Sequence, residues 1–171
     1  MERDGVVFRP VEEEDKEFLR KLINHENVRD TIGMAPKPKN LKDEEEHVEL
    51  ASEQDDAAYF LIEYEGEKVG TISLENINRD YRRCHLGLSI HPDYHGQGIG
   101  TTSVQMITDY AFKDLNMHKV RGGYLEHNPA SKRIMEKAGF QEEGIEREFK
   151  LVDGGWKDVI WMSILEQEWR E

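Results

Sequence analysis

Three glycines at alternate positions mark the stretch of this chain that is best suited to chemistry. Gly96, Gly98 and Gly100 follow a segment, 86–90, in which leucine and isoleucine alternate with smaller residues, the spacing of a strand. Pro92 stops that strand because proline has no N–H for a ladder, and helical spacing begins after the last glycine. Glycines let a backbone approach a ligand closely, and the first turn of a helix presents free N–H groups. The pattern therefore predicts an anion site for a phosphate or pyrophosphate.

Known phosphate-binding patterns fit this turn to different degrees. A Walker loop needs lysine directly after its last glycine, and here Thr101 follows Gly100. A dinucleotide fingerprint needs the spacing G-x-G-x-x-G in the first strand–helix unit, whereas these glycines are spaced G-x-G-x-G and lie past mid-chain. The alternative without a ligand, a tight turn that simply needs glycine, stays open on these residues alone.

The segments downstream of the turn supply a second pattern. Residues 119–125 have the spacing of a strand, and Asn128 and Pro129 suit the N-cap and first position of a short helix. Gly139 suits the C′ position of that helix. A strand, a helix and a second strand in this order predict two parallel strands joined by a right-handed crossover.

These patterns together resemble the GNAT superfamily of N-acetyltransferases. The family's R/Q-x-x-G-x-G/A signature has its counterpart at 95–100, and its N-x-x-A/S signature followed by Gly-Phe has its counterpart at 128–131 and 139–140. The opening Phe-Arg-Pro at 8–10 and the closing Gly-Gly-Trp-Lys-Asp at 154–158 extend the similarity over nearly the whole chain. It is most similar to the branch of ribosomal-protein N-terminal acetyltransferases and polyamine acetyltransferases.

The resemblance implies one acetyltransferase domain over residues 1–171, with an α/β (α+β) fold. The sheet is expected to be mixed and mostly antiparallel, with about seven strands, a fourth and fifth strand that are parallel and splay apart, and flanking helices. The expected strands are 6–10, 59–64, 69–74, 84–90, 119–126, 145–152 and 156–165; the expected helices are 13–23, 42–52, 100–112 and 129–138, with a loop at 30–41.

The resemblance also implies acetyl-CoA as cosubstrate, with no metal. The pantetheine arm is expected to pair with the backbone of Leu88, Ser89 and Ile90, and to contact Asn128. The pyrophosphate is expected on the glycine turn, whose residues are His95, Gly96, Gln97, Gly98, Ile99, Gly100, Thr101 and Thr102. His95 stands where the family has arginine or glutamine, and its imidazole can still donate a hydrogen bond to phosphate.

Acetyl transfer to an amine needs a proton acceptor, because an alkylamine is mostly protonated at pH 7. Glu75 and Glu126 each follow or end an expected strand and are the candidate bases; water alone is the alternative. The departing thiolate needs a proton, which many family members draw from a tyrosine seven residues after the asparagine. Met135 stands at that position, and a thioether cannot donate. Ser131 stands where the resemblance to the ribosomal-protein acetyltransferases implies a serine that acts on the thiolate, and it is the candidate donor; a purely structural first-turn serine is the alternative.

Composition narrows the class of protein further. The chain has 171 residues with no long apolar run, so no transmembrane helix is expected. Its start lacks a signal-peptide core, and a single cysteine, Cys84, excludes an intrachain disulfide, which favours the cytoplasm. A net charge of −13 argues against nucleic-acid binding, repels an anionic cosubstrate at long range and attracts a cationic amine.

The leading expectation is an acetyl-CoA-dependent N-acetyltransferase that acts on a protein N-terminal α-amine. A polyamine such as spermidine is the alternative acceptor; the acidic charge favours it, whereas Met135 counts against it because polyamine acetyltransferases retain the tyrosine. A non-catalytic acyl-CoA-binding domain is the alternative from another class. Acceptor specificity is expected in the loop 30–41 and the closing hairpin. The sequence leaves the oligomeric state open, a homo-oligomer included.

Overall fold

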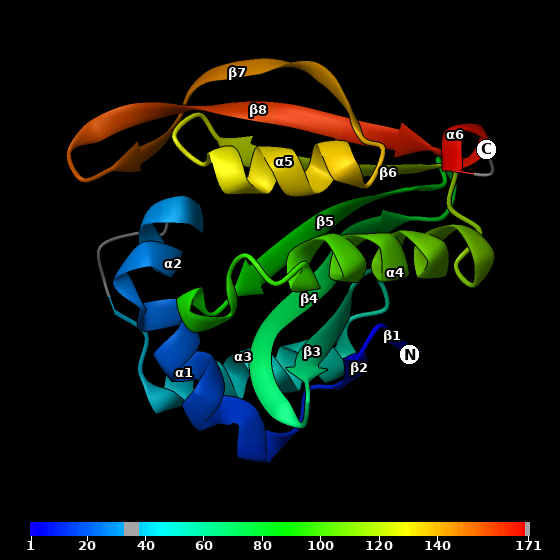
Figure 1. Ribbon diagram of the computed structural model, residues 1–171. Helices are drawn as coiled ribbons and strands as arrows, with labels where there is room; N and C mark the ends of the chain where they lie inside the picture. Colours follow the sequence, from blue (N-terminus) through cyan, green and yellow to red (C-terminus); the bar gives the residue numbers. More distant parts are fainter. Residues whose placement is uncertain (33–37, 170–171) are drawn as a thin grey trace.

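One mixed sheet organises the part of the chain, 1–32 and 38–169, that the computed structural model describes (Figure 1). Its strand order is β1-β2-β3-β4-β5-β6-β8-β7. The strands are β1 (Glu2–Arg3), β2 (Val6–Pro10), β3 (Ala58–Tyr64), β4 (Glu67–Asn78), β5 (Arg83–Ile90), β6 (Lys119–Leu125), β7 (Gln141–Val152) and β8 (Gly155–Leu165). The helices are η1 (Glu13–Asp15), α1 (Lys16–Asn24), α2 (Glu26–Ile32), α3 (Leu41–Glu53), η2 (Pro92–Tyr94), α4 (Ile99–Lys113), α5 (Pro129–Lys137) and α6 (Glu166–Trp169).

The expected parallel pair is confirmed in β5 and β6, which α4 connects, while the other paired neighbours in the sheet are antiparallel. The parallel register runs from Arg83 opposite Lys119 to Leu86 opposite Gly122 and then stops. Both strands continue beyond this point, β5 to Ile90 and β6 to Leu125. The two strands therefore splay apart toward their carboxyl ends, as the resemblance implied.

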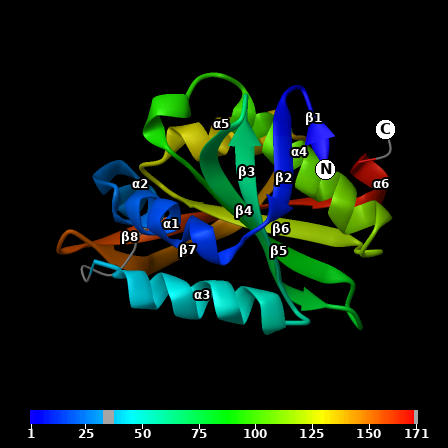
Figure 2. The same ribbon diagram turned by 90° about the horizontal axis from the view of Figure 1, so that it is seen from below.

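Helices lie on both sides of the sheet, and Figure 2 shows α3 on the side away from α4 and α5. The inner face of α4 is the expected one, with Val104, Ile107 and Ala111 all at most 1% exposed. They share one core with Ile72 and Leu74 of β4, so α4 is fixed on the sheet by burial of apolar surface. No helix in the described ranges is long and apolar enough to cross a membrane.

Several expectations about single elements are corrected. Residues 30–32 belong to α2 and are not loop, while 33–37 of the expected loop lie outside the described residues. Only Val28 of α2 is buried, so the helix has no apolar stripe that periodicity could detect. The two-residue β1 makes the sheet eight-stranded, and β7 begins at Gln141. Trp156, next to the β7–β8 turn, is 59% exposed.

Candidate active site

The glycine turn opens α4 with unpaired backbone donors. Gly96 and Gly98 have φ values of +80° and +86°, which side chains other than glycine rarely adopt. Gly98 is the N-cap, and no side chain caps the helix. The first helical bond runs from the N–H of Thr102 to the Gly98 carbonyl at 3.0 Å, so the N–H groups of 99–101 have no helical acceptor. Three free donors at the positive end of a helix dipole are an arrangement that attracts anions, whereas the N–H of Thr102 is already used.

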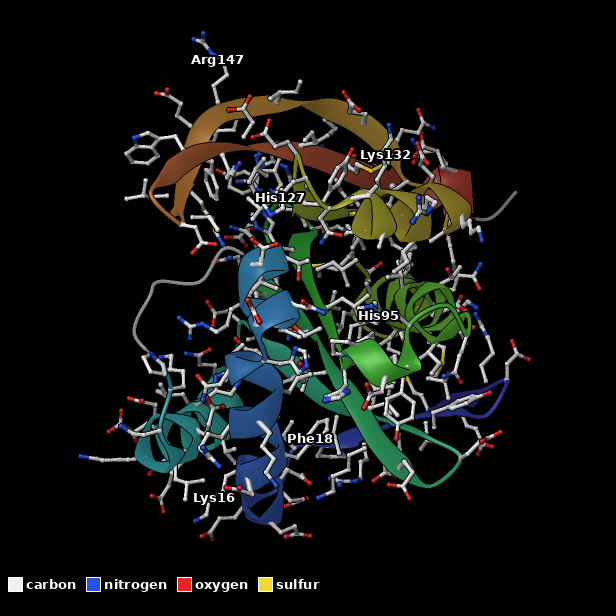
Figure 3. All side chains as sticks on the ribbon, turned by 60° about the vertical axis from the view of Figure 1, so that its left-hand side comes forward. Lys16, Phe18, His95, His127, Lys132 and Arg147 are labelled. Atoms are coloured by element: carbon white, nitrogen blue, oxygen red, sulfur yellow. The ribbon has the colours of Figure 1, made fainter. Side chains whose placement is uncertain are left out.

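His95 is placed differently from the expected phosphate donor. The side chain lies just before α4 (Figure 3), and its Nε2 donates to the carbonyl of Ile90 at 3.0 Å. This bond satisfies the last carbonyl of β5 and ties the turn to the strand. Only the other ring nitrogen, Nδ1, is left for a ligand. The imidazole is thus first a structural link between β5 and the glycine turn.

The edge of β5 beyond the splay point exposes backbone groups. The N–H of His91 donates to the carbonyl of Val69 on β4 at 2.8 Å. Because successive residues of a strand direct their backbone bonds to opposite sides, Leu88 and Ile90 direct theirs away from β4, into the gap left by β6. Ser89 by the same alternation faces β4 with its backbone. The groups available to a pantetheine amide are therefore those of Leu88 and the N–H of Ile90.

A polar group lies beside this edge, on the face of the sheet away from α4. Ser73 Oγ donates to Oε1 of Glu75 at 2.8 Å. A Cβ added at Gly87 would stand 2.7 Å from that hydroxyl and 3.4 Å from the carboxylate oxygen. Gly87 is the first residue of β5 after the parallel pairing ends. The absence of a side chain there lets the Glu75 carboxylate lie against the backbone where the strands part.

Further polar and aromatic side chains on this face were not found from the sequence. The pKa of Tyr59 on β3 is raised, mainly by burial and secondly by the Glu75 carboxylate. The Tyr59 ring meets His47 of α3 edge to face at 5.2 Å between centroids. On β6, the Arg121 guanidinium stacks 3.9 Å from the ring of Trp161. Strand alternation across β5 could have identified one more residue, His85, because it shares a face with Gly87.

The short helix α5 fixes the residues of the second signature. Oδ1 of Asn128 accepts the backbone N–H of Ser131 at 3.1 Å, so the asparagine is an N-cap, as its position predicted. Met135 is 3% exposed, and a Cβ added at Gly122 would stand 2.4 Å from its terminal methyl carbon, Cε. Met135 therefore packs against β6 near the splay point and belongs to the core.

The two candidate bases are far from equivalent. Glu75 lies beside the unpaired edge of β5, held by Ser73. Glu126 follows the carboxyl end of β6 in a turn, where its N–H donates to the Asp158 carbonyl and its side chain is exposed. The next residue, His127 (Figure 3), pairs with Asp30 of α2 at 3.4 Å. The structure thus brings Glu75, and not Glu126, next to the backbone where the strands diverge.

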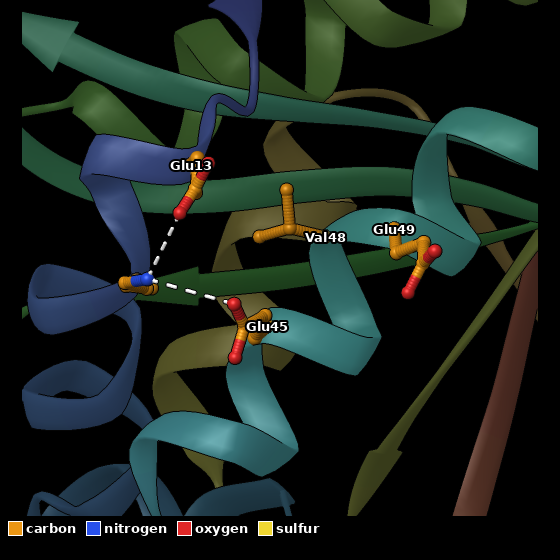
Figure 4. Close-up of a pocket in the computed structure, with 5 residues that line it drawn as sticks. Glu13, Glu45, Val48 and Glu49 are labelled. Atoms are coloured by element: carbon orange, nitrogen blue, oxygen red, sulfur yellow. Dashed lines mark hydrogen bonds and ion pairs between the residues drawn. The ribbon is translucent and has the colours of Figure 1, made fainter.

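A separate hollow of about 300 Å³ lies between η1, α1 and α3 (Figure 4). Lys16 lies between two carboxylates there, with Nζ 3.1 Å from Glu13 and 3.8 Å from Glu45. Val48 and Glu49 complete the wall. Its residues come from elements other than the glycine turn and the β5 edge, so it is not part of the donor site described above.

Comparison with known proteins decides the family. The model of the acetyltransferase (GNAT) domain matches residues 6–141, which include both signatures and the splayed strands. The chain belongs to the GNAT acetyltransferase family. The resemblance drawn from the two signatures is therefore confirmed, and so is the mixed fold with its splayed parallel pair.

Relatives of this GNAT chain act on more than one kind of amine. The probable N-acetyltransferase YjcK of Bacillus subtilis is 34% identical over 125 residues, 72% of this chain, which spans 64% of that relative's length. Spermidine N(1)-acetyltransferase of Escherichia coli is 30% identical over 169 residues, 96% of this chain and 88% of that protein. The Escherichia coli ribosomal protein uS5-alanine N-acetyltransferase is 27% identical, over 68% of this chain and 61% of that protein.

A solved structure of another GNAT protein supports the same family assignment. The spermidine N-acetyltransferase of Vibrio cholerae, in complex with CoA and spermine, has a TM-score of 0.92 and 26% identity; the match covers 99% of this chain and all of that one. The arrangement of strands and helices is therefore shared from end to end, while about three residues in four differ. Both proteins share the fold and the family. Any difference between their acceptors must therefore come from the residues that differ.

Proposed function

We propose that this protein transfers the acetyl group of acetyl-CoA to a primary amine. The observation that carries the proposal is the juxtaposition of two sets of unpaired backbone groups: the N–H groups that open α4, and the edge of β5 at Leu88 and Ile90. The first set fits a pyrophosphate and the second fits the amides of pantetheine. Asn128, which caps α5 on the other side of the gap, has its Nδ2 left to contact the same arm.

The amine is proposed to approach from the face that carries Glu75. After the ammonium ion has lost one proton, the nitrogen lone pair forms the C–N bond as the C–S bond breaks; the electron pair leaves on sulfur, and a second proton leaves nitrogen to water. The N–H of Leu88 donates to the carbonyl oxygen as negative charge develops there. The Glu75 carboxylate attracts the ammonium form of the amine, and the Ser131 hydroxyl supplies a proton to the thiolate.

We propose polyamines and protein α-amines as the two acceptors to compare. The full-length similarity to spermidine acetyltransferases and the net charge of −13 favour a polycation. An α-amine has a pKa near 8, against about 10.4 for an alkylamine, so far more of it is neutral at pH 7. That difference favours the α-amine, the acceptor that the sequence put first, because less of it must be deprotonated before attack.

A panel of acceptors tests the proposed function directly. Spermidine, spermine and peptides with free N-termini are each incubated with acetyl-CoA, and thiol release and the mass gain of one acetyl group are measured. Transfer to any primary amine supports the proposal, and the preferred acceptor decides between the two classes. Tight acetyl-CoA binding without acceptor-dependent thiol release would leave the non-catalytic acyl-CoA-binding domain; no binding of CoA would exclude both.

We also propose that the chain forms a homo-oligomer through the outer strands β7 and β8. Ile145, Leu151 and Trp156 are each more than half exposed there, next to an edge strand. Exposed apolar side chains gathered on one hairpin are typical of association surfaces. A dodecameric structure is known for the spermidine N-acetyltransferase of Vibrio cholerae. Light scattering of the protein and of Trp156→Glu tests this, since a monomer in both cases would contradict it.

A further inference from the structure

His85 occupies the centre of the polar face where the strands part. Across β4 it is the register partner of Glu75, and across β6 it is the register partner of Arg121. Directly opposed side chains on one face of a sheet have Cβ atoms about 5 Å apart. The imidazole lies 5.9 Å from the Trp161 ring, and among the described residues no hydrogen bond to its ring nitrogens is found. The ring is therefore held in place by packing with its nitrogen atoms unengaged.

The surroundings favour the neutral form of this imidazole. Burial lowers its pKa first, and the guanidinium groups of Arg121 and Arg83 lower it further; Glu75 acts in the opposite direction. A neutral imidazole has one nitrogen with a free lone pair. The last parallel pair of β5 and β6 is Leu86 with Gly122, and His85 is the residue just before it. His85 therefore lies directly before the exposed edge of β5.

We propose that His85 is a catalytic residue that takes the proton of the acceptor ammonium, while Glu75 binds that cation. The inference rests on the proposed function and assigns the base within the same site. The ammonium N–H bond breaks with its electron pair left on nitrogen, and the proton goes to the free ring nitrogen of His85. The neutral amine then forms the C–N bond as the C–S bond breaks. The second amine proton passes to water as the amide forms, and water returns one proton to the Ser131 oxygen after that hydroxyl has protonated the thiolate.

Two physical reasons favour His85 over Glu75 as the proton acceptor. When the neutral imidazole accepts the proton, the Glu75 carboxylate stays charged and keeps its attraction for the cation, whereas a Glu75 that accepted the proton would lose its charge. After proton transfer, the imidazolium faces the Glu75 carboxylate across the strand pair, and this charge pairing stabilises it. The other histidine on this face, His47, packs against Tyr59 on β3, which lies two strands further from the gap than β5.

The test compares His85→Gln with His118→Gln, an exposed histidine on the loop before β6 that pairs with Glu166. The rate kcat at saturating substrates is followed from pH 5 to 9 with two acceptors whose amine pKa values differ. We expect His85→Gln to lower kcat about 100-fold. In the wild type, kcat should fall on the acidic side of the profile at the same pH for both acceptors. This fall should be absent in His85→Gln. Acetyl-CoA affinity, measured by calorimetry, stays at the wild-type value. The His118→Gln profile matches the wild type.

A titration of the ring by NMR gives a readout that does not need turnover. We expect the His85 ring to be neutral at pH 7 and its pKa to fall further in Glu75→Gln, because the carboxylate that favours the charged form is gone. A ring that is protonated at neutral pH, or an unchanged kcat profile in His85→Gln, overturns the proposal. Wild-type protein that transfers acetyl to no amine overturns the proposed function, and with it this one, whatever the titration shows.

Discussion

At the scale of single residues, the thiolate side of the site differs from the amine side. Met135 fills the position of the usual tyrosine and is buried against Gly122, so it supplies no proton. Ser131 begins the same helix, and its backbone is fixed by the Asn128 cap. The hydroxyl of a half-buried serine on a fixed first turn is then the remaining side-chain donor that the signature offers.

Ser131→Ala tests this role of the hydroxyl. We expect kcat to fall about 10-fold at neutral pH, because loss of one proton donor costs a modest factor when water replaces it. Acetyl-CoA affinity and the unfolding midpoint should change little, since the Asn128 cap uses the backbone N–H and not the hydroxyl. Ser131→Thr, which keeps the hydroxyl, is the matched control. Equal rates in the alanine and threonine variants would show that the serine is structural.

A second residue, Asp15, holds the start of α1 on the sheet. Its carboxylate is fully buried and accepts two bonds from the Arg9 guanidinium, at 2.7 and 2.8 Å, and lies 2.6 Å from Lys68. Burial alone would raise the pKa of Asp15, but the hydrogen bonds from Arg9, Lys68 and the Glu12 N–H outweigh it and hold the pKa well below the usual range.

Asp15→Asn should lower the free energy of unfolding by about 3 kcal/mol, because it leaves two cations without their buried partner. The pKa of Asp15 is depressed in the folded state, so its contribution is complete above the unfolded value near 4 and is lost as the pH falls through the folded value. Urea unfolding at pH 7 and below pH 4 measures both effects. Glu17→Gln, in an exposed pair with Arg20, is the control and should change little.

At the scale of elements, the start of α4 joins the donor site to the fold. The left-handed Gly98 turns the chain so that the first N–H groups of the helix face outward, while Ile99 is 2% exposed and anchors the same turn in the core. Burial on one side and free donors on the other fix the direction of the site without any charged side chain.

Gly98→Ala should weaken acetyl-CoA binding about 10-fold, since a side chain at φ +86° strains the turn that aims the donors. Gly66→Ala is the matched control, because Gly66 has φ +84° with no atom within 4 Å of an added Cβ, in the β3–β4 turn. Both variants should lose about 1–2 kcal/mol of stability. Calorimetry would contradict the anion site if the two variants bound acetyl-CoA with equal affinity.

At the scale of the whole molecule, the net charge of −13 acts oppositely on the two proposed substrates. Acetyl-CoA is anionic and a polyamine is cationic, so the field of the protein repels the first and attracts the second. The proposed phosphate site on the neutral backbone donors of the α4 turn would reduce this conflict locally, because backbone N–H groups at a helix start attract anions without a cluster of basic side chains.

Raising the ionic strength from about 0.1 M to 1 M shortens the Debye length from about 10 Å to about 3 Å. We expect the KM for spermidine to rise several-fold and the KM for acetyl-CoA to fall, with kcat nearly constant. A peptide acceptor with a single α-amine serves as the control and should respond weakly. Steady-state kinetics with matched stability at each salt concentration measure the effect; parallel changes in both KM values would argue that local contacts outweigh the field.

The sequence by itself determined the family and the parallel strand pair, and the family resemblance then implied the splay of that pair. The signatures that carry the resemblance are local: glycines at fixed spacing, a proline that ends a strand, and an asparagine with a proline that starts a helix. The burial of α4 was also predictable, because an apolar stripe at helical spacing packs against the hydrophobic core.

Only the tertiary structure decided which polar side chains meet at the splay point. Glu75 and Glu126 had equal standing as carboxylates at strand ends, and strand pairing separated them: antiparallel register brings Glu75 opposite His85, whereas Glu126 lies past the end of β6. The helix α2 was missed for a related reason, since a segment with one buried residue is held by contacts from other elements. Local pattern sets what a segment can form, and long-range register sets which side chains become neighbours.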